Sequence, residues 1–214
     1  MKSKIDNRKS KIPLILASAS PRRAQLLSEA GITFTVIVSP NHEPERKPAA
    51  IPTDLWPMCL AYMKATAVQR KLGTRNSNPK TPTILAADTI VVAGTAPHER
   101  ILNKARDRAH ARQILQSLQG QTHRVITGIC LLQASGGGER VRLASATALC
   151  RIRKKSRAWL EDYLDSGLWR GKAGAYGIQD AHDPFVDLLA GDFSTVVGLP
   201  MPLVQSELAS FQKD

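Results

Sequence analysis

A long apolar stretch, Thr83 to Ala93, carries a single charge, that of Asp88. A run of this length and composition predicts a central strand of a β-sheet. An unpaired carboxylate in a protein core costs several kcal/mol, so a chain of this kind has few ways to accommodate it. The side chain of Asp88 must be paired, bound to a metal, or placed at an exposed end of the strand.

The segments around this strand alternate between strand and helix patterns. Before Asp88 they predict strands over 12–17 and 34–38 and helices over 21–30 and 55–72; after it, a short strand over 100–102 and a helix over 107–118. Two strand patterns then follow one another, at 123–133 and 141–152, with the glycines of 136–138 between them. A helix from Ser156 to about Leu164, a strand over 185–189 and an interrupted closing helix over 195–211 complete the chain. The order predicts an α/β fold with a mixed sheet and flanking helices.

The composition is that of a globular protein. The chain has 214 residues, 43% of them apolar, which suits one domain or one domain with two lobes. No apolar stretch approaches the ~20 residues of a membrane-spanning helix, and the N-terminal residues 1–11 lack the apolar core of a signal peptide. The cysteines, Cys59, Cys130 and Cys150, are odd in number and far apart. This favours reduced thiols and therefore the cytoplasm.

The formal net charge of +12 favours an anionic partner such as a nucleotide, a nucleic acid or an acidic lipid. Much of the excess lies in the first eleven residues, interpreted as a flexible basic tail, and in the run Arg151 to Arg157. We interpret the second run as solvated faces at the end of a strand and the start of a helix. The chain lacks the interleaved aromatic and basic residues of a nucleic-acid module, so nucleic acid is not the expected partner.

The segment Ser18 to Arg23 joins the first predicted strand to the first predicted helix. Ser20 is expected as the N-cap and Pro21 as the first helical residue. Arg22 and Arg23 lie in the first turn, where a cation opposes the helix dipole unless an anion binds there. A bound phosphate would reverse that cost and accept bidentate hydrogen bonds. An ordinary capped helix with two exposed arginines explains the segment equally well.

Asp88 and three further residues could form a site. Asp88 suits a catalytic base or a magnesium ligand, but a salt bridge to Lys64 or Lys104 would also satisfy it. Lys64 lies on a partly apolar helical stripe, and Lys104 lies at a turn into a helix. Each lysine either contacts phosphate or simply extends its ammonium group into solvent. Glu43 follows the second predicted strand, where loop carboxylates hold a cation less often than they are simply solvated.

The stretch Lys172 to Gln179 is a loop punctuated by glycines. Small residues let the backbone approach a ligand closely. The amide of Gln179 offers a donor and an acceptor, which suits the edge of a uracil or thymine ring. A plain turn is the alternative.

Taken together, these segments resemble the Maf family of nucleotide pyrophosphatases. The matching segments, in family order, are Leu16–Arg23, Ala61–Lys64, Ala87–Thr89, Ser117–Gly128, Ala173–Gln179 and Val196–Pro200. The resemblance implies that residues 12–214 form a single domain with two lobes around a deep cleft, similar to inosine-triphosphate pyrophosphatases. It also implies a divalent cation, Mg²⁺ or Mn²⁺, a house-cleaning role in nucleotide metabolism and a homodimer.

Carried over by position, the resemblance assigns a role to each candidate residue. Asp88 would be the general base or would hold the metal together with Glu43. The phosphate-binding residues would be Ser18, Arg22, Arg23, Lys64 and Lys104. The reaction implied is metal-assisted attack of water on the α-phosphate of a nucleoside triphosphate, with pyrophosphate leaving.

Three positions separate two branches of this family. The branch that acts on dTTP and UTP carries Arg, Thr and Gln, which match Arg22, Thr89 and Gln179. The branch that acts on 7-methyl-GTP tends to carry Trp, Gln and Glu. The sequence therefore predicts a dTTP/UTP pyrophosphatase, with the 7-methyl-GTP activity and a non-enzymatic role in division or nucleic-acid binding as alternatives. One departure is Asn103-Lys104-Ala105, where the family has Gly-Lys-Pro.

Overall fold

The computed structural model describes residues 13–40, 44, 46–73, 81–135, 138–179 and 185–212. The expected basic tail, residues 1–11, lies outside the described residues, and so does Glu43.

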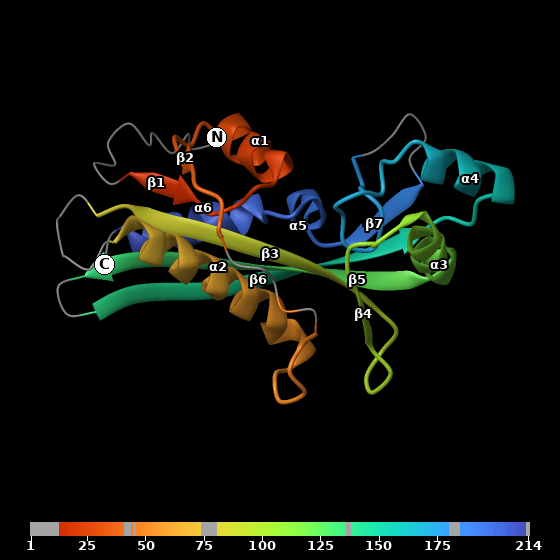
Figure 1. Cartoon of the computed structure of the whole chain (residues 1–214), viewed down its shortest axis with the longest axis horizontal. Coiled ribbons are helices and arrows are strands. Elements are labelled where there is room, and N and C mark those ends of the chain that lie inside the picture. Colours follow the sequence, from red (N-terminus) through yellow and green to blue (C-terminus); the bar gives the residue numbers. More distant parts are fainter. Residues whose placement is uncertain are drawn as a thin grey trace. The chain divides into compact units, whose positions relative to one another are not determined.

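The apolar run at Thr83–Ala93 forms β3, and its predicted bounds are confirmed. The other strands are β1 (Leu14–Leu16), β2 (Thr35–Val36), β4 (Arg100–Leu102), β5 (Thr122–Ser135), β6 (Gly138–Ile152) and β7 (Val186–Ala190). The sheet order is β2-β1-β3-β5-β6-β7, and β4 pairs with β3 (Figure 1). Pairing is parallel for β1 with β2 and β3, and antiparallel for β3 with β4 and for β6 with β7. The predicted mixed α/β sheet is therefore confirmed.

The helices are α1 (Pro21–Glu29), α2 (Trp56–Leu72), α3 (Arg108–Leu118), α4 (Arg157–Asp165), α5 (Phe193–Val197) and α6 (Met201–Phe211), with a short 3₁₀ turn, η2, at Thr53–Leu55. Three side chains cap helices by accepting backbone N–H groups: Asp107 accepts from His110, Ser156 from Trp159 and Asp192 from Ser194. No helix among the described residues is both long and apolar enough to cross a bilayer.

The second predicted strand is shorter than expected. The strand expected over 34–38 is only Thr35–Val36, and both residues are exposed. Its apolar side chains therefore supply little buried area to extend it. The closing helix expected over 195–211 is interrupted near its start, as predicted, because Gly198 adopts a left-handed φ of 116° and ends α5, and Pro200 precedes α6.

The chain divides into two compact units. One comprises Met1–Asp88, Gly128–Ser145 and Met201–Asp214, and the other comprises Thr89–Thr127 and Ala146–Pro200. The deep cleft and the likeness to inosine-triphosphate pyrophosphatases stay predictions.

In the first unit, α2 packs on the sheet through residues at helical spacing. Ala61, Ala65 and Val68 share a core with Ile84 and Ala86, which alternate along β3. All five side chains are almost fully buried. Helical spacing on one side and strand alternation on the other therefore build the same interface.

In the second unit, α3 and α4 close a core that contains most of its aromatic residues. Trp159, Tyr163 and Phe185 have ring centroids 4.7–5.3 Å apart. The run Arg151 to Arg157 lies beside this core. Its charged residues Arg151, Arg153, Lys154 and Arg157 are exposed, as the solvated-face interpretation predicted, whereas Lys155 is partly buried and lies over the ring of Trp159.

The cysteines bear out the expectation of free thiols. Cys59, Cys130 and Cys150 are all unpaired, and the last two are buried while Cys59 is partly exposed. Burial raises the pKa of Cys130 to about 12 and that of Cys150 to about 11. Thiols in this state are poor nucleophiles, so they serve packing and not catalysis.

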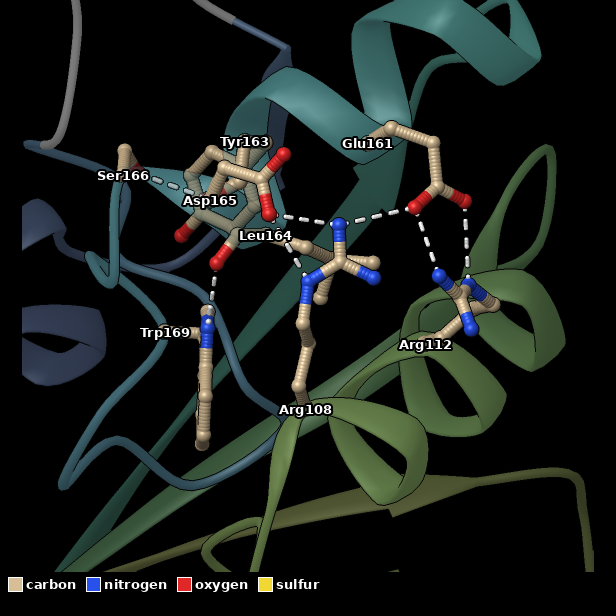
Figure 2. A network of polar contacts seen from close by, with 8 residues as sticks. All are labelled: Arg108, Arg112, Glu161, Tyr163, Leu164, Asp165, Ser166 and Trp169. Atoms are coloured by element: carbon tan, nitrogen blue, oxygen red, sulfur yellow. Dashed lines mark hydrogen bonds and ion pairs between the residues drawn. The ribbon is translucent and has the colours of Figure 1, made fainter.

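An ion-pair network joins α3 to α4, as Figure 2 shows. Arg112 donates to both oxygens of Glu161, at 3.0 and 2.5 Å, and Arg108 bridges Glu161 (2.9 Å) and Asp165 (2.6 Å). The hydrogen bonds from Arg112 are the largest cause of a lowered pKa at Glu161. The four side chains are 31–67% exposed, so solvent screens the network.

The exchange of Glu161 for glutamine should therefore reduce the stability of the fold only slightly. We expect Glu161→Gln to lower the unfolding temperature by no more than about 4 °C, and by less in high salt, because exposed charges are screened. Thermal unfolding followed by circular dichroism at low and high salt measures both effects, with Asp162→Asn on the exposed side of α4 as control. A salt-independent loss several times larger would contradict a screened surface network.

Candidate functional site

Asp88 is the sixth residue of β3, and only 6% of its surface, backbone included, is exposed to solvent. Its Oδ1 accepts a hydrogen bond from Nζ of Lys64 on α2. Of the three arrangements that the sequence allowed, pairing is the one observed. Placement at an exposed strand end is wrong, because β3 continues for five residues to Ala93, and of these five only Thr89 is partly exposed.

The contact follows from the local geometry of the two elements. Side chains alternate along a strand, so Asp88 follows Ile84 and Ala86 on the face that packs against α2. On α2, Lys64 is one turn beyond Ala61, which belongs to that same core. The side chain of Lys64 is 13% exposed and that of Asp88 8%. The pair therefore lies at the edge of an apolar interface, where each charge compensates the other.

Ser18 and Arg23 form a second group, at the junction of β1 and α1. Oγ of Ser18 accepts hydrogen bonds from the backbone N–H of Ser20 and from Nη1 of Arg23, each at 3.2 Å. Ser20 is the N-cap residue of α1 and Pro21 the first helical residue, as predicted, although the side chain of Ser20 makes no capping hydrogen bond. Arg22 and Arg23 are both half-buried in the first turn.

The structure pairs Lys104 with the glycine-punctuated loop. Lys104 and Ala173 form an antiparallel bridge, and the N–H of Gly174 donates to the carbonyl of Leu102 at 3.1 Å. Lys104 itself is exposed. Two loops that the sequence offers as separate candidates therefore lie side by side, and the Asn103-Lys104-Ala105 departure falls within their pairing.

The same loop holds residues that differ widely in exposure. Lys172 is only 7% exposed, although a lone lysine in a loop gives no sequence signal of burial. Gln179, at the other end, is exposed. Gly174 has a φ of 68°, and a Cβ there would lie 3.0 Å from the side chain of Val91 on β3, so this glycine allows the loop to approach the strand closely.

A buried contact between His123 and Tyr176 anchors the loop to β5. Nε2 of His123 lies 2.6 Å from the hydroxyl of Tyr176, and the two rings meet edge to face. Burial lowers the pKa of His123 to about 4 and raises the pKa of Tyr176 well above its ordinary value. Both groups are therefore neutral at pH 7. No pattern in the sequence predicts that His123 and Tyr176, which are 53 residues apart, are in contact.

Thr89 belongs to a third group, made of hydroxyls. Its Oγ1 lies 2.9 Å from Oγ1 of Thr127 on β5, and Thr127 donates to the carbonyl of Thr195 on α5 at 2.8 Å. Neither Thr127 nor Thr195 was a candidate from the sequence. Their contacts link positions 38 and 68 residues apart, and no local pattern reports such a pairing.

The residues described offer one buried carboxylate to a metal. Within the described ranges, no three His, Cys, Asp or Glu side chains gather into a cluster that could hold an ion. Mg²⁺ commonly uses only one or two carboxylates, with substrate phosphates and water completing its shell. The carboxylate oxygens of Asp88 are hard ligands that fit that chemistry. The described residues do not form a metal site made of protein ligands alone.

Comparison with known proteins gives consistent similarities. The family model for Maf-like proteins matches residues 13–211. A dTTP/UTP pyrophosphatase of Chelativorans sp. (strain BNC1) is 40% identical over 197 residues, which cover 92% of this chain and 90% of that protein. Proteins of the same name are 38% identical in Bdellovibrio bacteriovorus, over 92% of this chain and 98% of theirs, and 37% identical in Hyphomonas neptunium, over 88% and 90%. Each similarity spans nearly the full length of both chains.

Proposed function

The chain belongs to the family of Maf-like proteins, and from that membership we propose that it hydrolyses dTTP and UTP to the monophosphate and pyrophosphate. Water would add to the α-phosphorus while the bond to the bridging oxygen breaks, which releases pyrophosphate. The names of the three relatives, each covering most of the chain, support this substrate class.

The observation that carries the proposal is the buried contact between Asp88 and Lys64. A buried ion pair contributes little to stability compared with apolar side chains of the same volume, so its presence in the middle of a core strand favours a chemical role. Asp88 would accept the proton of the attacking water or would hold a cation. The ammonium group of Lys64 has three donors, so it can contact Asp88 and a phosphate oxygen together.

The remaining phosphate ligands would be Ser18, Arg22, Arg23 and Lys104. Ser18 already orients the guanidinium of Arg23 through their hydrogen bond, and a planar guanidinium suits bidentate contact with phosphate. The N-terminal turn of α1 adds the positive end of the helix dipole.

Asp88 and Glu43 would hold a divalent cation, Mg²⁺ or Mn²⁺. Such a cation polarises a phosphoryl oxygen and lowers the pKa of bound water. Arg22, Thr89 and Gln179 would select the base, since they carry the residue types of the pyrimidine branch.

A panel of nucleotides tests this function. With Mg²⁺ or Mn²⁺ present, we expect kcat/KM for pyrophosphate release from dTTP and UTP to exceed that for 7-methyl-GTP at least about tenfold, which corresponds to about 1.4 kcal/mol of transition-state discrimination. Removal of the cation with a chelator should abolish release.

Two outcomes would redirect the proposal. Preference for 7-methyl-GTP would move the chain to the other branch of its family. Absence of pyrophosphate from every nucleotide would favour a non-enzymatic role, to which the net charge of +12 lends its only support.

The surroundings of the enzyme are also part of the proposal. We place it in the cytoplasm, where its buried thiols Cys130 and Cys150 stay reduced, and we propose that it forms a homodimer and does not bind nucleic acid. Light scattering on the purified full chain, alone and with duplex DNA, measures both properties.

A further inference from the structure

The loop from Lys172 to Gln179 has a disfavoured backbone conformation at its centre. Gly174 and Ala175 follow one another with φ values of 68° and 60°. Both values lie in the left-handed region, which glycine adopts readily and which a residue with a Cβ avoids. Among the residues that the structure describes, Ala175 is the only one other than glycine with a positive φ. A backbone of this kind persists only where the surrounding contacts hold it.

Buried contacts hold this turn from within the second unit. Ala175 is 0% exposed and belongs to the core of that unit, together with Tyr176. The N–H of Ala175 donates to the carbonyl of Lys172 at 3.1 Å, and the N–H of Gly174 donates to the carbonyl of Leu102 at the same distance. The turn is therefore tied to its own start and to the end of β4.

One polar contact holds the loop after the turn. The hydroxyl of Tyr176 meets Nε2 of His123 on β5, and the ring of Tyr176 also meets that of Phe185 edge to face. Tyr176 is 5% exposed and His123 2%. Loss of either partner leaves the other short of a hydrogen bond inside the core, which is unfavourable. The contact therefore ties the loop to a fixed position of the sheet.

Gln179 emerges directly from this held segment. Residues 174–177 are buried, and Ile178 is half-buried against the same core. Gln179 is the first exposed residue after the turn. The backbone that carries its side chain is thus ordered before any ligand arrives, and a group presented in this way loses less freedom on binding.

We infer that Tyr176 and His123 are positioning residues, which hold Gln179 where its amide meets the edge of a pyrimidine base. This rests on the proposed function, in which Gln179 contacts the base. Both side chains are buried, so they can act on a base only through the loop. Loss of their contact should therefore weaken the binding of the base and leave the binding of the triphosphate unchanged.

A ratio of two affinities, measured by calorimetry on the full chain with Mg²⁺, tests the inference. The Kd of inorganic triphosphate, which has no base, is divided by the Kd of α,β-imido-UTP. Tyr176→Phe and His123→Leu each break the contact and should lower this ratio about fivefold, as expected for the loss of one hydrogen bond. His123→Gln, whose amide can still meet the hydroxyl, and Tyr62→Phe, at an exposed tyrosine of α2, should keep the wild-type ratio. An unfolded fraction of a variant changes the stoichiometry and not the ratio.

A double variant separates positioning of Gln179 from other effects. Gln179→Ala should itself lower the ratio, and Tyr176→Phe added to it should change the ratio no further, because both act through one side chain. An unchanged ratio in Tyr176→Phe or in Gln179→Ala, or a second loss in the double variant, would overturn the inference. The expected ratios without pyrophosphate release from UTP would remove the proposed reaction and keep the inference. An active enzyme whose ratio ignores Tyr176→Phe would do the reverse.

Discussion

Replacement of Asp88 by asparagine should reduce kcat for pyrophosphate release from dTTP roughly 1000-fold, within the range that general acid–base catalysis contributes. Asparagine keeps the shape of the side chain and removes its charge and its ability to take a proton. Asp88 is 6% exposed and sits in the interior of β3, so the exchange alters one buried group without exposing a new surface. Initial rates at saturating dTTP, with Mg²⁺ present, measure the effect.

Loss of activity must be separated from loss of structure. Asp88→Asn removes the carboxylate that Lys64 contacts, and removal of one partner of a buried ion pair costs about 3–5 kcal/mol of stability. The double variant Lys64→Met, Asp88→Asn removes both charges and should regain most of that stability while it stays inactive. Asp162→Asn, on an exposed carboxylate of α4, controls for the chemistry of the exchange. A folded Asp88→Asn protein with more than about a tenth of wild-type kcat would exclude Asp88 as the base.

The sequence predicts the Asp88 contact only as one of several alternatives. The apolar pattern places Asp88 within a strand and Lys64 on a helical stripe. Whether Lys64 or Lys104 reaches the carboxylate depends on how α2 lies against β3, and the packing of Ala61 and Ala65 on Ile84 and Ala86 sets that position. Periodicity predicts each surface separately, but it does not predict which two surfaces meet.

Long elements are predicted more accurately than short ones for a related reason. Residues Thr83–Ala93 and Trp56–Leu72 each bury many apolar side chains, so their patterns are strong. The strand Thr35–Val36 buries neither of its side chains, and its extent is set by backbone pairing with β1, which leaves no trace in composition.

The start of α1 shows a similar limit. The sequence predicts Ser20 as the N-cap and Pro21 as the first helical residue, and both positions are confirmed. The side chain of Ser20 nevertheless makes no capping hydrogen bond, and the hydroxyl of Ser18 accepts hydrogen bonds from the N–H of Ser20 and from Arg23. Which hydroxyl reaches which donor depends on the path of the chain as it leaves β1, and residue type alone cannot report that path.

Stability should fall in acid because of His123. Its side chain is buried and its pKa is lowered to about 4, whereas an unfolded histidine titrates near 6.5. Between these values the unfolded chain binds a proton that the folded chain excludes, so unfolding becomes easier as the pH falls through about 6.5 and the loss is complete near 4. The difference in pKa corresponds to about 3 kcal/mol. Urea unfolding at a series of pH values from about 7.5 to 4 measures the slope.

Carboxylates also titrate in this range, so the contribution of His123 must be measured as a difference between proteins. His123→Gln cannot gain a proton, yet its amide can still meet the hydroxyl of Tyr176. Its free energy of unfolding should therefore change with pH by about 3 kcal/mol less than that of the wild-type protein, whatever its absolute stability. His98→Gln, at an exposed histidine of the same unit, should follow the wild-type curve. If the His123→Gln and wild-type curves ran parallel, His123 would have to accept its proton within the folded core, and the loop from Lys172 to Gln179 would be anchored to a charged histidine and not to a neutral one.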